Sequence, residues 1–547
     1  MGIPSFFSYI VKNYSKIIYK INPHFVTSHF FLDSNSIIYN ELYKILNNNT
    51  DEPIDIEHLL IENTCLSIQN YINIIKPTKL AYISFDGVAP VAKLKQQRTR
   101  RHKSVYQSSM ENNIKKWDTC AITPGTEFMR KLHEYLDSYN FVTDATVIIS
   151  SSFLPGEGEH KIFQHIRDNH NHNHNHDPSD NLVIYGLDAD LIILALNHLK
   201  FNNNIYLFRE TPHFIKTIDS NLDPDSLYLC DINLLGDEIA QILYQKTTQY
   251  QTVKNISPEL KYGKITDYVF LSFFLGNDFM PHFPSANIRT SGIDIIINAY
   301  FYVVKRDETL IVDIDNPKIN WRVLRQLLKY LTENEVSNIC KEYSIRDKQT
   351  KSIYRRLSDM PLKELTKSKI LENIPLFDRK IEEYIDPFKA GWVDRYYTSL
   401  FDIYDINPTM IKNLCINYFE GLEWTLKYYT SGCPDWRWFY KYDYPPLFTD
   451  LFNIAPFNNI EFITDDTKPT VDKQIVTAIH PYVQLSYVLP KKSLNLIPSE
   501  IRNNLKNEWY ADNYDFKWAF CKYFWEAHPN LPHTTVDEIE SVLQNNF

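Results

Sequence analysis

The stretch LVIYGLDADLIILAL, residues 182–196, predicts the fold and the position of its functional edge. We expect an apolar strand over residues 182–187, a turn that carries Asp188 and Asp190, and the start of an apolar helix. Two acids two positions apart in an extended segment point the same way, and ligands of α/β sheets bind at the carboxyl ends of strands. The pair therefore suggests a divalent-cation site, although acidic residues also cap helices.

Length and composition indicate a globular chain with two or more domains. The 547 residues are 44% hydrophobic and 23% charged, and no apolar run approaches the roughly 20 residues of a membrane span. We therefore expect no membrane association. Seven scattered cysteines without a CxxC pair argue against a disulfide framework or structural zinc, which favours a reducing compartment. We expect a cytoplasmic location, with the nucleus as the alternative.

Alternation of strands and helices predicts a mostly parallel sheet flanked by helices. Residues 1–20 have the spacing of an amphipathic helix, and a strand over residues 29–38 breaks at Asp33. A helix at 56–75 leads to a strand at 79–85, directly before Asp86, and a strand at 145–152 leads to Glu157 and Glu159. A further strand is expected at 204–208 and a helix at 232–246. An apolar helix broken at Gly276 places Asp278 just past its end.

A basic segment, VAKLKQQRTRRHK, follows at residues 91–103. In a helix, Lys93, Gln97, Arg100 and Arg101 would share an arc of about 100°, a cationic face with one amide donor that suits a phosphate group. A solvated basic face or a localisation signal is the alternative. The formal net charge of −10 argues against nucleic-acid binding on average, but this local cluster beside acidic residues outweighs it.

Three regions are expected along the chain: 1–304 as an α/β core, 305–385 as a helical connector with short helical patterns, and 386–547 as a second region rich in aromatic residues. Residues 415–451 are dense in Trp and Tyr. Most such rings pack in a core, but an exposed ring can stack on a base. The tract NHNHNHNH at 169–176 is expected to be a surface loop, because nothing fixes its histidines around a metal.

The acids at strand and helix ends define the expected chemistry. Seven carboxylates gathered in one cleft need cations, and oxygen ligands favour Mg²⁺ or Mn²⁺ over zinc. Two such ions would support phosphodiester hydrolysis, and the basic helix would hold a substrate phosphate. We therefore expect a nuclease. The seven acids are Asp33, Asp86, Glu157, Glu159, Asp188, Asp190 and Asp278.

Several longer motifs resemble one known family. DGVAPVAKLKQQRTRR, ITPGTEFM, PGEGEHKI, YGLDADLI, FFLGNDFMPHFPS, PDWRWFYKYDYPP and VQLSYVLP are similar to the two conserved regions of the 5′→3′ exoribonucleases of the Xrn1/Rat1 type. The resemblance covers most of residues 1–304 and much of 390–500. It implies a nuclease core of the PIN/FEN kind that processively hydrolyses 5′-monophosphorylated single-stranded RNA to mononucleotides with two metal ions.

The resemblance also assigns residues. The seven acids match the family's metal-binding carboxylates, and the four residues of the basic face match its 5′-monophosphate pocket. A His that stacks on the terminal base in the family is replaced by Tyr39, and the partner Trp is Trp436 or Trp438. The family's additional C-terminal domains have no match here, so we expect a compact, monomeric form without an obligate protein partner.

Two other functions remain as alternatives. A structure-specific 5′ flap nuclease acting on DNA shares the acidic α/β core and a basic helix, but lacks the aromatic second region. A catalytically altered RNA-binding scaffold would be favoured by loss of a core acid, and all seven are present.

Overall fold

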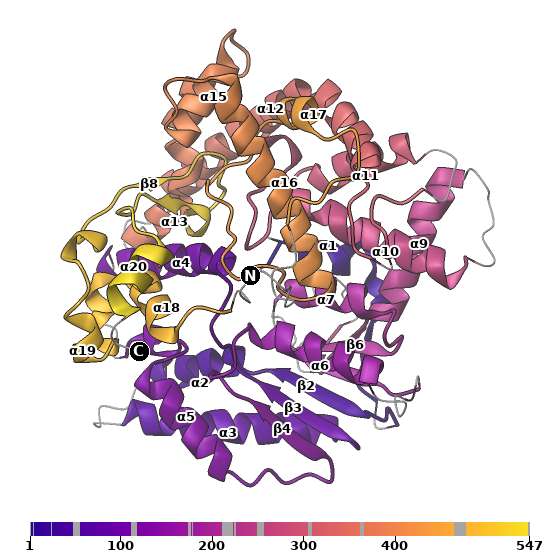
Figure 1. Cartoon of the computed structure of the whole chain (residues 1–547), viewed down its shortest axis with the longest axis vertical. Helices are drawn as coiled ribbons and strands as arrows, with labels where there is room; N and C mark the ends of the chain where they lie inside the picture. The colour runs from indigo at the N-terminus through magenta and orange to yellow at the C-terminus, as the bar shows by residue number, and fades with distance from the viewer. Residues whose placement is uncertain are drawn as a thin grey trace.

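The parallel sheet expected from the sequence forms the centre of one half of the molecule (Figure 1). The computed structural model describes residues 2–3, 5–22, 24–47, 55–110, 117–172, 177, 179–186, 188–209, 222–223, 226–248, 256–304, 309–314, 316–360, 366–463 and 477–544. Seven strands lie in the order β1-β7-β6-β5-β2-β3-β4. Their bounds are β1 Ile18–Lys20, β2 His29–Asp33, β3 Leu80–Ser84, β4 Thr146–Ser150, β5 Leu182–Tyr185, β6 Ile205–Arg209 and β7 Tyr228–Asp231.

Five of these strands run parallel, and the edge is finished by an antiparallel pair. β6, β5, β2, β3 and β4 pair in parallel, whereas β7 runs antiparallel to both β6 and β1. The central strands β5, β2 and β3 are buried on both faces, as is usual in parallel sheets, whereas the edge strand β4 is partly exposed. Successive residues of β5 show this: Leu182 and Ile184 pack in one hydrophobic core, and Val183 and Tyr185 pack in the other.

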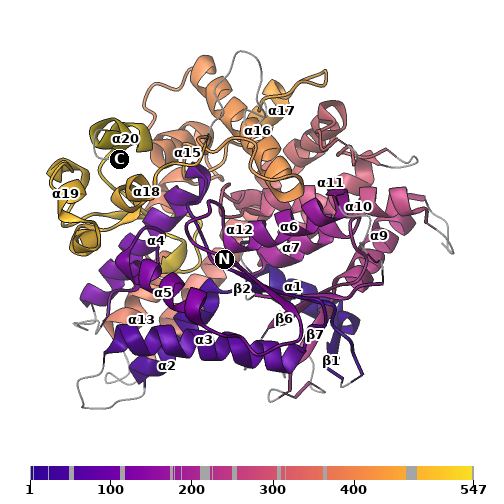
Figure 2. The same ribbon diagram turned by 60° about the horizontal axis from the view of Figure 1, so that its bottom comes forward.

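Helices cover both faces of the sheet (Figure 2). One face packs against α2, α3 and α5, and the other against α1, α6, α7 and the helices that follow. Their bounds are α1 Phe6–Asn13, α2 Asn35–Asn47, α3 Ile56–Ile75, α4 Val91–Met110, α5 Glu127–Ser138, α6 Gly158–His172, α7 Asp190–His198, α9 Ile232–Thr248, α10 Pro258–Ser272 and α11 Gly292–Val303. Thr126 caps α5 as its sequence suggests, because its hydroxyl accepts a hydrogen bond from the Met129 amide.

The second half of the chain is mainly helical and packs onto the first half. Its helices are α12 Trp321–Ser358, α13 Lys367–Phe377, α14 Lys380–Ile385, α15 Trp392–Phe401, α16 Pro408–Thr430, α17 Phe448–Ile454, α18 Pro481–Val488, α19 Ser499–Arg502 and α20 Val536–Leu543. A short hairpin joins β8 Phe516–Lys517 and β9 His528–Pro529. Single-turn helices lie at η1 Ser15–Ile17, η2 Thr119–Ala121, η3 Phe273–Leu275, η4 Pro284–Ala286, η5 Lys491–Leu496, η6 Asn507–Trp509 and η7 Phe524–Glu526.

Two packing contacts tie the halves together. One hydrophobic core runs without a break from the sheet through α7, α10 and α11 to α12 and α16. A second core contains Val91 and Leu94 of α4 together with residues of α18 and α20, with α18 packed on α4 and α20 packed on α18. The basic helix is therefore held between the sheet layer and the end of the chain. Within the described part of the chain, no helix combines the length and the apolar character needed to cross a bilayer.

Three local expectations were wrong. The helix expected over residues 1–20 ends at Asn13, because residues 18–20 pair with β7 as an edge strand, and β7 itself was not expected. The segment expected to hold short helices contains α12, a single helix of 38 residues. The histidine tract continues α6 as far as His172, and its remainder lies outside the described residues.

A core substitution tests the two-sided burial of the sheet. Ile184 in β5 is 0% exposed, so Ile184→Ala is expected to lower the free energy of unfolding by about 2–5 kcal/mol, as measured by urea denaturation. Ile148→Ala, at a residue of β4 that is 38% exposed, is the matched control and should cost less than half as much. Equal losses for the two variants would contradict the assignment of Ile184 to the core.

Candidate active site

Six of the seven acids singled out in the sequence lie at or just after the carboxyl ends of four adjacent strands, β5, β2, β3 and β4, and Asp278 follows η3. Asp33 is the last residue of β2, and Asp86 follows β3 by two residues. Glu157 and Glu159 flank the start of α6 after β4. The pair Asp188 and Asp190 follows β5, but not in the extended form expected, because Asp190 is already the first residue of α7.

Gly158 lets two of these acids come close together. Its backbone N–H donates a 2.7 Å hydrogen bond to Asp86 Oδ1. A β-carbon at this position would lie only 2.8 Å from Asp33 Oδ1 and 3.4 Å from Asp86 Oδ1. Asn35 holds the other oxygen of Asp86, since its Nδ2 donates to Asp86 Oδ2 over 2.8 Å. Gly158, the second glycine of the PGEGEH motif, is therefore needed because a side chain at this position would collide with the acids.

Lys93 of α4 lies between acids from two distant segments. Its Nζ is 2.6 Å from Glu157 Oε1 and 2.7 Å from Asp278 Oδ2. Asp278 reaches this position because Gly276, at φ +83°, turns the chain after η3. Although burial alone would lower it, the pKa of Lys93 is raised well above its usual range by Asp278 and Glu157. The ammonium therefore stays charged and offsets part of the acidic cluster.

The acids that remain around Lys93 repel one another. Burial and then Asp278 raise the pKa of Asp190 to about 7, and burial with Asp190 raises that of Glu159 well above normal. Burial and Asp86 do the same for Asp33. Buried carboxylates that face each other disfavour ionisation, and a cation removes that conflict.

A hard divalent cation fits this donor set. Asp190 is 2% exposed, and its Oδ1 is buried without a hydrogen-bond partner among the described residues. An oxygen of this kind, surrounded by other carboxylates, is a ligand suited to Mg²⁺ or Mn²⁺. In the structure, Glu157 and Asp278 are placed to form ion pairs with Lys93. Among the described residues, no three His, Cys, Asp or Glu side chains are already arranged around a single ion position.

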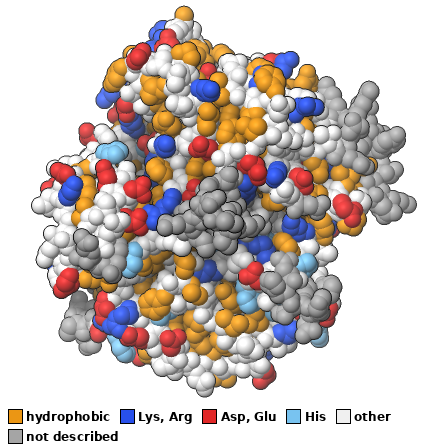
Figure 3. Space-filling model, in the orientation of Figure 1, with side chains coloured by type: hydrophobic (Ala, Val, Ile, Leu, Met, Phe, Trp, Pro, Cys, Tyr) orange, Lys and Arg blue, Asp and Glu red, His pale blue; other side chains and the backbone are white. Residues whose placement is uncertain are grey.

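The four residues of the expected cationic face all lie on α4, but they have different surroundings. Lys93 is paired with acids, and Arg100 is exposed. Arg101 lies between two polar groups: one guanidinium nitrogen donates to Gln97 Oε1 at 3.2 Å and another to Thr123 Oγ1 at 2.8 Å. The ITPGTEFM motif therefore supplies, through Thr123, an orienting contact for Arg101. In the space-filling view, which has the orientation of Figure 1, several Lys and Arg side chains are seen on the visible surface of the molecule (Figure 3).

The structure distinguishes the two candidate tryptophans. Trp438 is 9% exposed, stacks on Trp424 with ring centroids 5.4 Å apart, and donates from Nε1 to Glu420 at 3.2 Å. Trp436 is only half-buried, and its carbonyl accepts a 3.0 Å hydrogen bond from the first amide of α4, that of Val91. Tyr39 lies on α2 and is 37% exposed. Of the two tryptophans, Trp436 is the one with ring surface available for stacking.

Three residues around the acids were missed by the sequence reasoning. Asn35 is signalled only by its place two residues after Asp33. Tyr428 of α16 donates from its hydroxyl to Glu157 Oε2 at 2.8 Å, and it was not distinguishable among the many tyrosines of the second region. Gly2 lies so close to Asp190 that a β-carbon would come within 2.1 Å of its Oδ1. No sequence pattern pointed to Gly2.

Two family models and several known proteins match this chain. The model of the XRN 5′-3′ exonuclease N-terminus matches residues 1–211, and that of the Xrn1 helical domain matches residues 263–383 and 377–538. The chain is 27% identical to human 5′-3′ exoribonuclease 1 over 93% of its own length and 32% of that protein. It is 26% identical to the Drosophila melanogaster 5′-3′ exoribonuclease 2 homolog, over 98% of the chain and 70% of the relative. It is also 26% identical to 5′-3′ exoribonuclease 1 of Schizosaccharomyces pombe, over 97% of the chain and 47% of the relative.

The raised pKa of Asp190 predicts a pH-dependent gain in stability for Asp190→Asn in metal-free protein. With a pKa of about 7 in the folded state, Asp190 retains a proton that the unfolded chain releases near pH 4, so the wild type loses stability as pH rises. The neutral asparagine avoids this loss. We expect a gain on the order of 2–4 kcal/mol at pH 8 and a smaller one at pH 5, measured by unfolding in EDTA.

Asp405→Asn, at an exposed position in the segment between α15 and α16, is the control and should change stability little at either pH. If Asp190→Asn raises the free energy of unfolding by the same amount at pH 5 and pH 8, charge repulsion at Asp190 is not the cause of the gain.

Proposed function

Because this chain belongs to the family of XRN 5′-3′ exonucleases, we propose that it is a 5′→3′ exoribonuclease that hydrolyses single-stranded RNA with a 5′-monophosphate. The observation that carries the proposal is a group of buried acids at one sheet edge that meets the basic helix α4 through Lys93, which contacts Glu157 and Asp278. The family's name gives the reaction class, and the sequence has an acid at each of the seven positions that we expect to bind metal.

We propose two Mg²⁺ or Mn²⁺ ions as cofactors, held by Asp33, Asp86, Glu157, Glu159, Asp188, Asp190 and Asp278. The uncompensated carboxylates and the unpartnered Asp190 Oδ1 support this proposal. Such ions, when bound, would lower the pKa of a water molecule and stabilise the leaving oxygen of a phosphodiester. Lys93 and the hydroxyl of Tyr428 would keep Glu157 oriented, because both contact its carboxylate.

The 5′-monophosphate is assigned to the exposed part of α4. Arg101 is pre-oriented by Gln97 and Thr123, and its planar guanidinium can bind two phosphate oxygens at once. Arg100 and Gln97 would add a charge and an amide donor. Lys93 is engaged by Glu157 and Asp278, so its contribution to the phosphate would be mainly electrostatic.

The first base is assigned to Tyr39 and Trp436. Stacking contributes roughly 1–3 kcal/mol per base and tolerates any sequence, which suits an enzyme that must process every nucleotide in turn. Processive digestion would follow if the rings hold the RNA while each mononucleotide is released. Trp438 is a core residue in the structure and is not needed for this assignment.

The proposed activity is tested with a 5′-monophosphorylated single-stranded RNA and Mg²⁺, with single-stranded and flap DNA as competing substrates. We expect 5′-mononucleotides from RNA only, and a loss of roughly 100-fold or more in Asp188→Asn, corresponding to about 2.7 kcal/mol of transition-state stabilisation. Asp405→Asn should retain the wild-type rate. Preferential cleavage of DNA flaps would instead support a flap nuclease, and binding of RNA without cleavage would support a scaffold.

The phosphate assignment predicts a specific defect in Arg101→Gln. A charged hydrogen bond is worth about 1.5–3 kcal/mol, so the preference of kcat/KM for 5′-phosphate over 5′-hydroxyl RNA should fall by at least about tenfold. Arg322→Gln, an exposed arginine of α12, serves as the control. If the wild type cleaves both RNAs equally, or if Arg101→Gln slows both to the same extent, the assignment is wrong.

A further inference from the structure

A hollow lined in part by α4 adjoins the acids at Asp278, and we call it the rear cavity. Its volume is about 350 Å³, and its walls come from α4 and from residues between 275 and 289, 440 and 444, and 519 and 528. Asp278 and Arg100 both line it, so the rear cavity begins at the acidic centre. Its volume is at the lower end of the range of roughly 300–1,000 Å³ for small-ligand sites.

Cations, acids and aromatic rings line the rear cavity. Lys95, Lys103 and Arg289 are in its wall together with Tyr442 and Trp525. Lys95 pairs with Asp443 at 2.9 Å and Arg289 pairs with Glu526, and both acids also line the cavity. The guanidinium of Arg289 lies 5.6 Å from the ring centre of Trp525. A flat base can stack on such rings, and a phosphate can compete with the two carboxylates for the cations. The wall therefore carries the kinds of group that bind a nucleotide.

Several polar atoms in this wall have no partner. Gln96 Oε1, Asn277 Nδ2 and the Tyr444 hydroxyl are buried without a hydrogen bond among the described residues, and all three residues line the rear cavity. Buried polar groups are normally satisfied, so an acceptor, a donor and a hydroxyl left in one wall point to a polar ligand. A base and ribose carry the matching groups.

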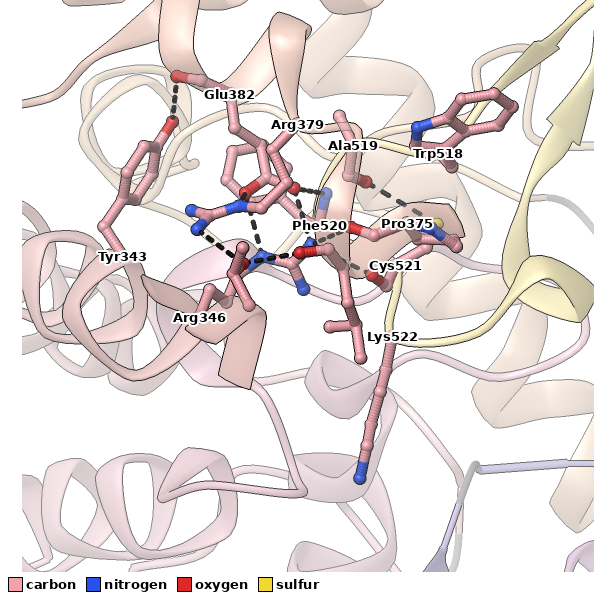
Figure 4. Close-up of polar contacts among 12 residues, drawn as sticks. Tyr343, Arg346, Pro375, Arg379, Glu382, Trp518, Ala519, Phe520, Cys521 and Lys522 are labelled. Atoms are coloured by element: carbon pink, nitrogen blue, oxygen red, sulfur yellow. Dashed lines mark hydrogen bonds and ion pairs between the residues drawn. The ribbon is translucent and has the colours of Figure 1, made fainter. Parts of the chain in front are cut away.

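The wall opposite α4 is held in a fixed shape by a buried ionic cluster (Figure 4). Arg346 and Glu382 are each 1% exposed at their side chains, with Arg346 Nη2 2.7 Å from Glu382 Oε1. Glu382 Oε1 also accepts a 2.9 Å hydrogen bond from the Phe520 amide, and Arg346 donates to the Cys521 carbonyl at 3.0 Å. Phe520, which lines the rear cavity, is held at φ +61°, a conformation that non-glycine residues seldom adopt.

The buried ion pair and the conformation of Phe520 that fix this wall both lower the stability of the fold, so folding alone does not explain why they are present. A buried ion pair and a left-handed phenylalanine both oppose stability, and such features persist where the surrounding structure fixes them for a role. Arg379 strengthens the same cluster, because its Nε lies 2.6 Å from Glu382 Oε2. The result is a preformed wall, as binding sites for small ligands usually have.

We propose that the rear cavity receives the nucleoside 5′-monophosphate released at each cycle and is its exit route. This inference rests on the proposed exoribonuclease activity. In 5′→3′ digestion the uncleaved RNA occupies the approach by which its 5′ end entered, so the mononucleotide has to leave by a different opening. The rear cavity starts at Asp278, has room for one nucleotide and carries the chemistry to bind it. Product release commonly limits turnover, so an exit of this kind would set the rate on long RNA.

Blocking the rear cavity tests the proposal. Thr99 of α4 lines the rear cavity and has no place in the proposed catalytic or phosphate sites, so Thr99→Trp narrows the route without removing a reactive group. On 5′-monophosphorylated RNA, the first cleavage in a single turnover should stay within twofold of the wild type. Steady-state release of mononucleotides should fall at least fivefold. Thr99→Val, of nearly the same shape, should release nucleotides like the wild type.

Wild-type rates for both steps in a folded Thr99→Trp protein would overturn the proposal, as would an equal loss in both steps. A second measurement does not depend on the variant. Wild-type protein in EDTA is irradiated with 8-azidoadenosine 5′-monophosphate, and the adduct is located by mass spectrometry. An adduct on Tyr442, Phe520 or Trp525 supports the proposal, and adducts confined to Tyr39 or Trp436 overturn it.

The two measurements separate this inference from the proposed function. If the wild type does not cleave RNA, the proposed function is wrong and the exit route with it. If the wild type cleaves RNA while the rear cavity binds no nucleotide, only the exit route is wrong.

Discussion

Repulsion among carboxylates at the edge of the sheet is the constraint on which the arrangement of the chain depends. Six of the seven acids follow a strand or lie at the start of a helix at the sheet edge, and Asp278 joins them from the turn after η3. The fold therefore brings like charges close together. Lys93 offsets Glu157 and Asp278, whereas Asp33, Glu159 and Asp190 have raised pKa values because burial removes the water that would screen them. On the proposed function, bound cations would offset these remaining charges.

The positions of α4 and α16 follow from this constraint. α4 has to bring a buried ammonium to Glu157 and Asp278, and it is fixed in place by α18 and α20 on one side and by the Trp436 carbonyl at its first turn. α16 carries the hydroxyl of Tyr428 to the other oxygen of Glu157. Residues more than 250 positions apart therefore share one carboxylate, which explains why the aromatic second region packs so closely on the sheet.

Much of this could be predicted from the sequence, because local patterns determine it. Alternating apolar strands and helices gave the parallel sheet, and an acid directly after a strand had to lie at its carboxyl edge, as Asp33 does. The contact partners of a side chain could not be predicted where the two residues are far apart in the sequence. The basic segment predicted a helix, but not that Lys93 would pair with acids while Arg101 forms a hydrogen bond with Thr123. Trp438 is buried because it stacks on Trp424 of α16, whereas Trp436 is only half-buried, and spacing alone reveals neither. The strands β1 and β7 were not predicted because short strands take their structure from their neighbours.

The packing of α18 against the start of α4, with α20 packed on α18, has a consequence for the synthesis of the protein. The acids and the basic helix precede α18 and α20 in the chain, so they leave the ribosome before the helices that fix α4. Until those helices emerge, a nascent chain holds its acidic residues without the packing that orders them. On the proposed activity, the protein becomes able to degrade RNA only after residues 481–543 have been made, so the order of folding delays its action on the messenger being translated.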